Sequence, residues 1–250
     1  MIEICDDGPV RTIRLAHGKA SALDLELLVE LERVVREFTM SSARAAILTG
    51  TGGIFSAGVD LHRLVEGGDQ YLDAFLPALE SAFRSLFFCA KPVVVACNGH
   101  AIAGGCVLLC CGDVRLAASG RGRIGVPELG VGVPFPRTAL ELIRFTVAPQ
   151  HVQSALLLGE TCDVETARQI GWVDRVVPPE ELHSEAMRLA SQLADYPPAA
   201  FAETKLLLRD PVLRRIRHEA YLNAAETRAL WASTPVRSAV AAYVQANLSG

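Results

Sequence analysis

The sequence predicts an α/β fold, on two observations. Through the first two thirds of the chain, apolar segments of strand length alternate with amphipathic segments of helical length, and short glycine-rich turns separate them. Half of the 250 residues are hydrophobic, which is enough to bury one large core. Regular alternation of strands and helices is typical of layered α/β domains.

The first 53 residues predict a β-hairpin, a helix and a strand in succession. The segments MIEICDD and VRTIRLA flank Asp7-Gly8-Pro9 and predict a β-hairpin. A helix is predicted over residues 21–38, because leucine and valine recur at helical spacing and Ser21 offers an N-cap. The strand AAILTG follows and ends at the glycines of residues 50–53.

The same order then recurs. The sequence predicts a helix over 70–88, a strand over 92–99, a short helix over 104–112, a strand over 113–119 and a turn at SGRGR. From Pro178 onward the pattern becomes helical, and three further helices are predicted over 179–196, 199–209 and 217–233.

Charge and hydropathy exclude several classes of protein. With 24 basic and 28 acidic residues the net charge is −4, so no overall basic surface favours nucleic acid. The longest apolar run, AIAGGCVLLCCG, is about a dozen residues, whereas about 20 are needed to cross a bilayer. The opening MIEICDDGPV lacks the features of a secretory signal, so we expect a cytoplasmic protein that neither binds nucleic acid nor enters a membrane.

The seven cysteines indicate packing rather than metal or redox chemistry. They lie at positions 5, 89, 97, 106, 110, 111 and 162, an odd number without a C-x-x-C pair. Neither His100 nor His151 completes a zinc-site spacing. We therefore expect buried free thiols and no metal.

The glycine-rich stretch GTGGIFSAG does not match the familiar nucleotide or nucleophile motifs. Counted from Gly50, the third glycine of a dinucleotide fingerprint falls on Phe55, and no Gly-Lys-Ser/Thr follows to make a phosphate loop. Ser56 lies one residue too far along for the G-x-S-x-G elbow of a serine hydrolase.

Two strand-to-glycine junctions remain, ILTGTGGIFSAGVDL and VVVACNGHAIAGGCVLL. Each presents free backbone N–H groups where a helix or turn begins, and two such junctions together could form an oxyanion hole. The alternative is that these glycines only make turns.

These residues resemble the enoyl-CoA hydratase/isomerase family, which has the crotonase fold. The segments HGKASALD, IFSAGVDL, KPVVVACNGHAIAGGCVLLCCGDVRLAA, IGVPELGVG and LLLGETCDVETARQIGWVDRVVPPEEL match its signatures in order. The resemblance implies a spiral of ββα turns over residues 1–195 and a helical trimerisation region over 196–250. It also implies an acyl-CoA thioester substrate, a homotrimer or dimer of trimers, and no cofactor, because coenzyme A is part of the substrate.

Carried over by position, the family's oxyanion donors fall on the amides of Val59 and Gly104. Ala57, Asp60, Leu61 and Gly105 are expected to bind substrate beside them, and Asp60 also to cap the next helix. One of the two carboxylates that serve the family's hydratases is present as Glu128. The position of the other is occupied by Val107, which cannot move a proton.

A single carboxylate favours one member of the family's chemistry. It can take a proton from C2 of a 3-enoyl thioester and return it at C4, as in the family's Δ3,Δ2-enoyl-CoA isomerases. For this task we expect apolar neighbours to raise the pKa of Glu128, with Val126, Leu129, Val131 and Phe135 as candidates.

Other functions stay open at this stage. An enoyl-CoA hydratase could manage with Glu128 alone or recruit Glu66, Asp69 or Glu141, and a non-catalytic acyl-CoA scaffold or another thioester reaction would fit the same fold. His100 and Cys106 are read as packing residues. The candidates for contact with CoA phosphates are His62, Arg63, Arg121, Arg123 and Lys205, although for each of them a solvated surface residue is the preferred interpretation.

Overall fold

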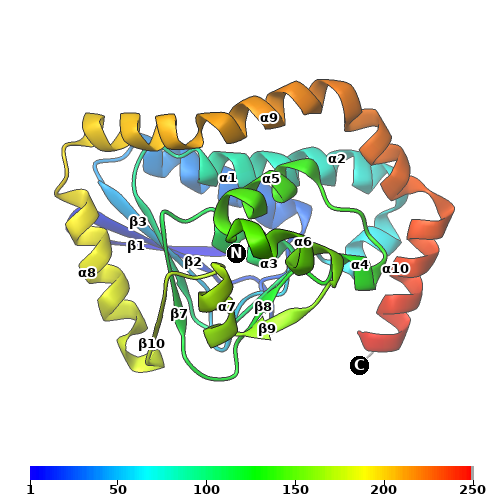
Figure 1. Ribbon diagram of the computed structural model, residues 1–250, viewed down its shortest axis with the longest axis horizontal. Helices are drawn as coiled ribbons and strands as arrows, with labels where there is room; N and C mark the ends of the chain where they lie inside the picture. The colour runs from blue at the N-terminus through cyan, green and yellow to red at the C-terminus, as the bar shows by residue number, and fades with distance from the viewer. Residues whose placement is uncertain (249–250) are drawn as a thin grey trace.

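A six-stranded sheet forms the centre of the computed structural model, which describes residues 1–248, although not the side chains of 218–224 (Figure 1). Its strand order is β1-β2-β3-β5-β7-β10. β1 and β2 form the predicted antiparallel hairpin, and the other neighbours are parallel. The strands are β1 (Ile2–Asp7), β2 (Val10–Leu15), β3 (Ala45–Thr49), β5 (Val93–Cys97), β7 (Val114–Ala118) and β10 (Arg175–Val177).

A second sheet of four short strands lies beside the first, in the order β4-β6-β8-β9. Its members are β4 (Ile54–Ser56), β6 (His100–Ile102), β8 (Arg123–Gly125) and β9 (Thr161–Asp163). Each turn of the chain adds one strand to each sheet, as β3 and β4, β5 and β6, and β7 and β8 do in succession. The result is the expected ββα spiral, although three-residue strands carry too little periodicity to be predicted individually.

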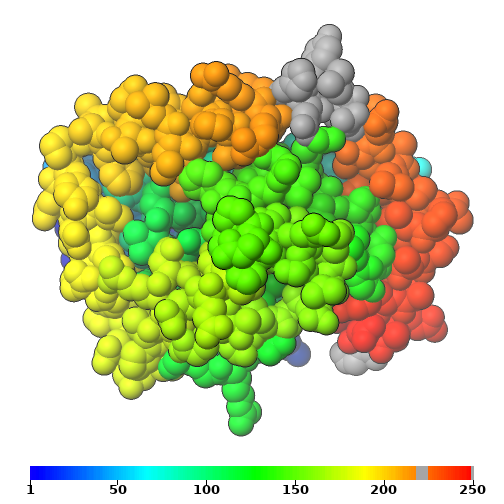
Figure 2. Space-filling view, viewed as in Figure 1, coloured from blue at the N-terminus to red at the C-terminus, as the bar shows by residue number. Residues whose placement is uncertain are grey.

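Helices cover the sheets and form one edge of the molecule. They are α1 (Leu25–Met40), α2 (Leu61–Phe87), α3 (Gly104–Cys110), α4 (Glu128–Val131), α5 (Arg137–Thr146), α6 (Pro149–Leu157), α7 (Val164–Ile170), α8 (Leu182–Ala194), α9 (Pro198–Ala232) and α10 (Thr234–Asn247). α9 runs along one side of the molecule and α10 turns back from its end (Figures 1 and 2). None of the helices in the described chain is long and apolar enough to span a bilayer.

The predicted N-cap Ser21 is wrong, because Asp24 caps α1 instead. The Asp24 carboxylate accepts a hydrogen bond from the amide of Leu27 at 2.8 Å. Ser21 has a positive φ of 44° and its hydroxyl donates to the carbonyl of Leu15. The helix starts later than its hydrophobic pattern suggests because the preceding segment pairs with the loop after β4, where the amide of Leu23 donates to the carbonyl of Gly58.

α2 begins nine residues earlier than predicted. Asp60 caps it, as expected, by accepting from the amide of Arg63 at 3.1 Å. At Gly68 the backbone leaves the helical region, with φ 59° and ψ −152°, so the helix is kinked. The sequence did not predict its first two turns, because adjacent Gly67 and Gly68 disfavour a helix.

The two helices predicted over 199–209 and 217–233 are one continuous helix, α9. It passes through Pro211, although proline inside a helix costs about 3 kcal/mol. Val212 and Ile216 are each only 1% exposed, and burial of such side chains against the core offsets much of that cost. The domain boundary after residue 195 stays a prediction, and residues 249–250 of the C-terminal region lie outside the described chain.

Five of the seven cysteines are buried as free thiols, as predicted, while Cys5 is exposed and Cys162 is half-buried. Burial raises the pKa of Cys97 to about 12 and also raises the pKa of Cys106 and Cys111. Such thiols stay protonated at neutral pH and fill space as small apolar groups.

An ion cluster fastens α9 to the central sheet. Asp113 accepts from Lys205 Nζ at 2.7 Å and from Arg209 Nη2 at 2.8 Å, and it also accepts from the amide of Val93. Lys205 is 7% exposed, so it is neither the solvated residue nor the CoA contact considered above. Its Nζ donates to Asp113 and to the carbonyl of Lys91 at 3.0 Å, so the charge is held inside the fold.

Removing that carboxylate should destabilise the protein strongly. We expect Asp113→Asn to lower the free energy of unfolding by about 3 kcal/mol, because two buried cations would lose their counter-charge. The exposed pair of Arg14 and Glu3, 3.5 Å apart, offers a matched control, and Glu3→Gln should cost less than about 1 kcal/mol. Urea unfolding of both variants checks this, and equal losses would contradict it.

Candidate active site

A cavity of about 570 Å³ lies where the two glycine junctions meet α4 and the C-terminal helices. It includes six of the seven residues that were expected at the site, together with Val107: Ala57, Val59, Asp60, Leu61, Gly104 and Glu128. Most of the other lining residues are apolar. Those that precede the C-terminal helices are Ala20, Ala22, Leu79, Phe83, Ile102, Ala103, Pro127, Val131, Val133, Pro136 and Ala139. We call this space the acyl cavity.

The amides of Val59 and Gly104 are brought together by direct contact between two loops. Gly58, with φ 82°, packs so closely on the other loop that a Cβ there would lie 2.6 Å from the carbonyl oxygen of Ile102 and 3.0 Å from the amide nitrogen of Gly104. Within the described chain, neither Val59 nor Gly104 donates its amide to another group. Two free donors beside each other on a cavity wall can bind a carbonyl oxygen that gains negative charge.

Hydrogen bonds hold the Val59 loop in position. The amide of Asp60 donates to the carbonyl of Leu23, while the carbonyl of Gly58 accepts from the amide of Leu23. The Ser56 hydroxyl donates to the carbonyl of Ser21 at 2.7 Å and accepts from the amide of Gly58 at 3.2 Å. Motif analysis considered Ser56 only as a nucleophile and missed this positioning role.

Backbone strain accompanies the Gly104 amide. Ala103 has φ 53° and ψ −126°, a conformation that residues other than glycine rarely adopt. The amide of Ala103 donates to the carbonyl of Gly125, and α3 begins at the next residue. This geometry places the Gly104 amide at the start of a helix, where the helix dipole adds to its pull on negative charge.

Gly105 does not line the acyl cavity, although it was expected to bind substrate. A Cβ on it would lie 2.3 Å from the carbonyl oxygen of Ser56. Its role in the structure is therefore to let α3 pack against β4, directly behind the paired amides.

Glu128 is the first residue of α4 and is 8% exposed. Burial raises its pKa from the usual 4.5 to about 8, and a backbone hydrogen bond only partly opposes this. Its Oε2 is buried without a partner in the described chain. Val131 shares the cavity wall, whereas Leu129 is 47% exposed and lies outside it, so Leu129 does not supply the predicted apolar surroundings.

Among the described residues that line the cavity, the carboxylates are Glu128 and Asp60, and the carboxylate of Asp60 is engaged as the cap of α2. Glu66, Asp69 and Glu141 do not line it. Glu141 is buried in ion pairs with arginines of α5 and α9, and Asp69 pairs with arginines of α9 and α10. Val107 faces the cavity with an apolar side chain.

Two basic side chains line the cavity, His62 and Lys19, and sequence analysis did not single out Lys19. Arg63 pairs instead with Glu26 at 2.6 Å. The loop of residues 119–122 projects from the surface, and Arg121 does not line the cavity (Figure 2). Arg123 donates to Thr161.

The two residues read as packing groups lie outside the cavity. His100 Nδ1 accepts from the amide of Arg123, and Cys106 is fully buried.

The C-terminal helices complete the cavity with three side chains that motif analysis missed. They are Trp231 at the end of α9, Tyr243 on α10, and Leu248 directly after it. Their sequence distance from the glycine junctions left no signal to connect them with the site.

Comparison with known proteins decides the family. The model of the enoyl-CoA hydratase/isomerase family matches residues 7–247. The chain belongs to this family. As an enoyl-CoA hydratase/isomerase family member it has the crotonase fold, and the expectation from its motifs is confirmed.

Named relatives in this family differ in their reactions. A carnitinyl-CoA dehydratase of Citrobacter koseri is 35% identical over 81% of this chain and 77% of its own length. A short-chain-enoyl-CoA hydratase of Clostridium acetobutylicum is 30% identical over 80% of this chain and 77% of its own. The crystal structure of human mitochondrial Δ3-Δ2-enoyl-CoA isomerase superposes with a TM-score of 0.94 at 25% identity, covering 100% of this chain and 99% of that one.

The burial of Glu128 predicts a pH-dependent difference in stability. The protonated form costs little to bury, so Glu128→Gln should match the wild type below about pH 4 and differ from it by about 1 kcal/mol at pH 5. As pH rises toward 8, the unfolded chain gains from ionising this group while the folded chain does not. With about 1.4 kcal/mol per pKa unit, Glu128→Gln should become more stable than the wild type by about 3 to 5 kcal/mol at pH 9.

Thermal unfolding of both proteins at pH 5 and pH 9 measures this difference. Glu165→Gln is the matched control, because Glu165 is exposed and its replacement should change the free energy of unfolding by less than about 1 kcal/mol. A gap for Glu128→Gln that does not grow with pH would contradict a buried carboxyl at this position.

Proposed function

We propose that this family member is a Δ3,Δ2-enoyl-CoA isomerase, which converts a 3-enoyl-CoA to the 2-enoyl-CoA. One observation carries the proposal: the cavity pairs the free amides of Val59 and Gly104 with a single buried carboxyl of raised pKa, Glu128, while Val107 takes the place of a second acid. Isomerisation moves one proton between two carbons and so needs only one such group.

The reaction follows from this arrangement. The thioester oxygen accepts hydrogen bonds from Val59 and Gly104, and the ionised Glu128 takes a proton from C2. The electron pair of the broken C–H bond moves into a dienolate, whose negative oxygen the two amides stabilise by about 3 kcal/mol each. Glu128 then returns the proton at C4, which leaves the double bond between C2 and C3.

The raised pKa of Glu128 suits both halves of this cycle. A carboxylate with a pKa of about 8 is a stronger base than a solvated glutamate, and it still releases its proton readily to the dienolate. Val107, on the wall of the same cavity, cannot hold the water molecule that a second carboxylate would position, so hydration of the product is disfavoured.

The family resemblance also implies a homotrimer or a dimer of trimers. Three consecutive leucines on α9, residues 206–208, are each at least 51% exposed. An exposed apolar surface of this kind supports assembly through α9. No cofactor enters the proposed reaction, since coenzyme A is part of the substrate.

The direct test is turnover of two substrates. With trans-3-hexenoyl-CoA we expect rapid formation of trans-2-hexenoyl-CoA, and with crotonyl-CoA little hydration, both followed by mass spectrometry. Glu128→Gln should lower kcat by about 10²- to 10⁴-fold, the usual contribution of a general acid–base group. The control Glu165→Gln should retain wild-type turnover. Isomerisation that survives in Glu128→Gln would refute the assigned role.

The pH dependence of kcat/KM tests the same group independently. Because the free enzyme must hold Glu128 ionised to accept a proton, kcat/KM should rise about tenfold per pH unit below pH 8 and level off above it. The measurement is the initial rate at substrate concentrations well below KM from pH 4 to 9.5. An inflection near pH 4.5 would mean that the carboxyl is solvated.

Enoyl-CoA hydratase is the second candidate, and the names of the sequence relatives favour it. Fast conversion of crotonyl-CoA to the 3-hydroxy product would establish it, and Asp60 would then be the first group to examine as a second acid. Tight acyl-CoA binding without turnover, unchanged in Glu128→Gln, would instead indicate a scaffold.

A further inference from the structure

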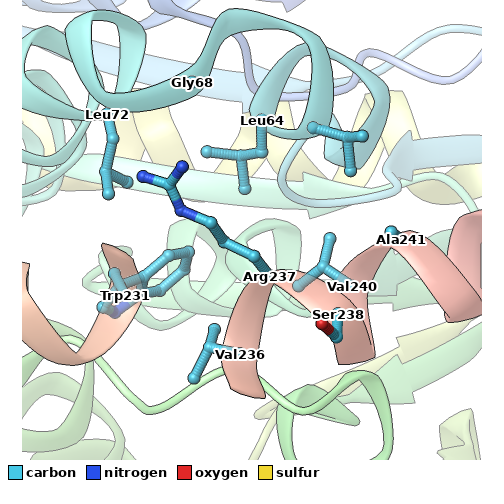
Figure 3. Close-up of a pocket in the computed structure, with 10 residues that line it drawn as sticks. Leu64, Gly68, Leu72, Trp231, Val236, Arg237, Ser238, Val240 and Ala241 are labelled. Atoms are coloured by element: carbon cyan, nitrogen blue, oxygen red, sulfur yellow. The ribbon is translucent and has the colours of Figure 1, made fainter. Parts of the chain in front are cut away.

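Trp231 forms a wall shared by the acyl cavity and a second cavity. The second cavity, of about 260 Å³, lies between α2 and α10 (Figure 3). Trp231 lines both spaces. In Figure 3, Trp231 at the end of α9 lies opposite Leu72 of α2, and Val236 and Arg237 of α10 flank it.

The second cavity is suited to a hydrocarbon chain. Its walls are largely apolar and include Leu64, Leu72, Val236 and Val240. The charged side chain on its wall is Arg237, which pairs with Asp69 at the surface. A charged ligand would find no free partner in that ion pair, whereas an alkyl chain would gain apolar contact.

One hydrophobic cluster joins the two cavities through the indole of Trp231. Val131 and Val133 line the acyl cavity, Leu72 and Val240 line the second cavity, and all four pack in one cluster with Trp231. The indole thus lies at the boundary between the two cavities.

Packing alone holds Trp231 in this position. The residue is 5% exposed, and its Nε1 is buried without a hydrogen-bond partner among the described side chains and backbone. A buried indole normally satisfies this donor. Replacing Trp231 therefore removes apolar volume without breaking a polar network, which makes it a clean position for changing cavity size.

We propose that Trp231 determines acyl chain length, limiting this protein to short- and medium-chain acyl-CoA by closing the acyl cavity against the second cavity. A small residue at 231 would join the two spaces and admit a longer chain. The inference rests on the acyl-CoA binding proposed above, but not on whether the reaction is isomerisation or hydration.

Binding of saturated acyl-CoA tests the inference apart from any reaction. We would measure Kd for butanoyl-, octanoyl- and dodecanoyl-CoA by calorimetry with the wild type and Trp231→Ala. The wild type should bind dodecanoyl-CoA at least tenfold more weakly than octanoyl-CoA. Trp231→Ala should bind dodecanoyl-CoA at least tenfold more tightly than the wild type does, with Kd for butanoyl-CoA within threefold of the wild-type value.

A filling variant supplies the matched control. Ala241 lines the second cavity only, so Ala241→Phe should occupy that space. In the Trp231→Ala background it should abolish the gain for dodecanoyl-CoA and leave butanoyl-CoA binding unchanged. Should Trp231→Ala fail to fold, Trp231→Leu keeps more of the packing and should show a smaller gain in the same direction.

Three results would overturn the inference. They are wild-type binding of dodecanoyl-CoA as tight as octanoyl-CoA, no gain in either variant at 231, and a gain that survives Ala241→Phe. Absence of binding for acyl-CoA of every length would refute both the inference and the acyl-CoA binding on which it rests. Length-dependent binding without isomerase turnover would uphold the inference and refute the proposed reaction alone.

Discussion

The site depends on the contact between two loops that follow parallel strands, one carrying Gly58 and the other running from Ile102 to Gly104. Because Gly58 has no Cβ, the two backbones approach closely enough for the amides of Val59 and Gly104 to share one cavity wall. Gly105, which also lacks a Cβ, lets α3 pack equally closely against the backbone of Ser56. The spiral makes this possible, since successive turns place β4 beside β6.

The second constraint is the burial of Glu128 in surroundings that do not compensate its charge. Elsewhere in the described chain, buried ionic groups are paired: Asp113 with Lys205 and Arg209, and Glu141 with two arginines. Glu128 has no such partner, and its pKa rises accordingly. A protein that pairs its structural charges and leaves one carboxyl unpaired in a cavity has the electrostatic arrangement expected of a general base.

The C-terminal helices supply part of the walls of both cavities. The ion cluster at Asp113 holds the first half of α9 against the sheet, and Trp231 at the end of the same helix lines the acyl cavity. α10 contributes Tyr243 to the acyl cavity and Val240 to the second cavity. The region that the resemblance associates with trimer contacts is therefore also part of the site.

The sequence by itself determined the family and the alternation of strands and helices, and it pointed to Val59, Gly104 and Glu128, which the structure brings to one cavity. The segments around Val59, Gly104 and Glu128 are local signatures that occur in the family's order, so they could be recognised without a structure. The helix boundaries were harder to predict from the sequence, because capping by Asp24 and the early start of α2 depend on loops that pair across the fold.

Only the tertiary structure decided which distant side chains share the cavity. Lys19, Trp231 and Tyr243 reach it from both ends of the chain, while Lys205, Glu141 and Gly105 turned out to be occupied elsewhere. The physical reason is that burial and pairing are properties of three-dimensional neighbours, and local periodicity carries no record of them.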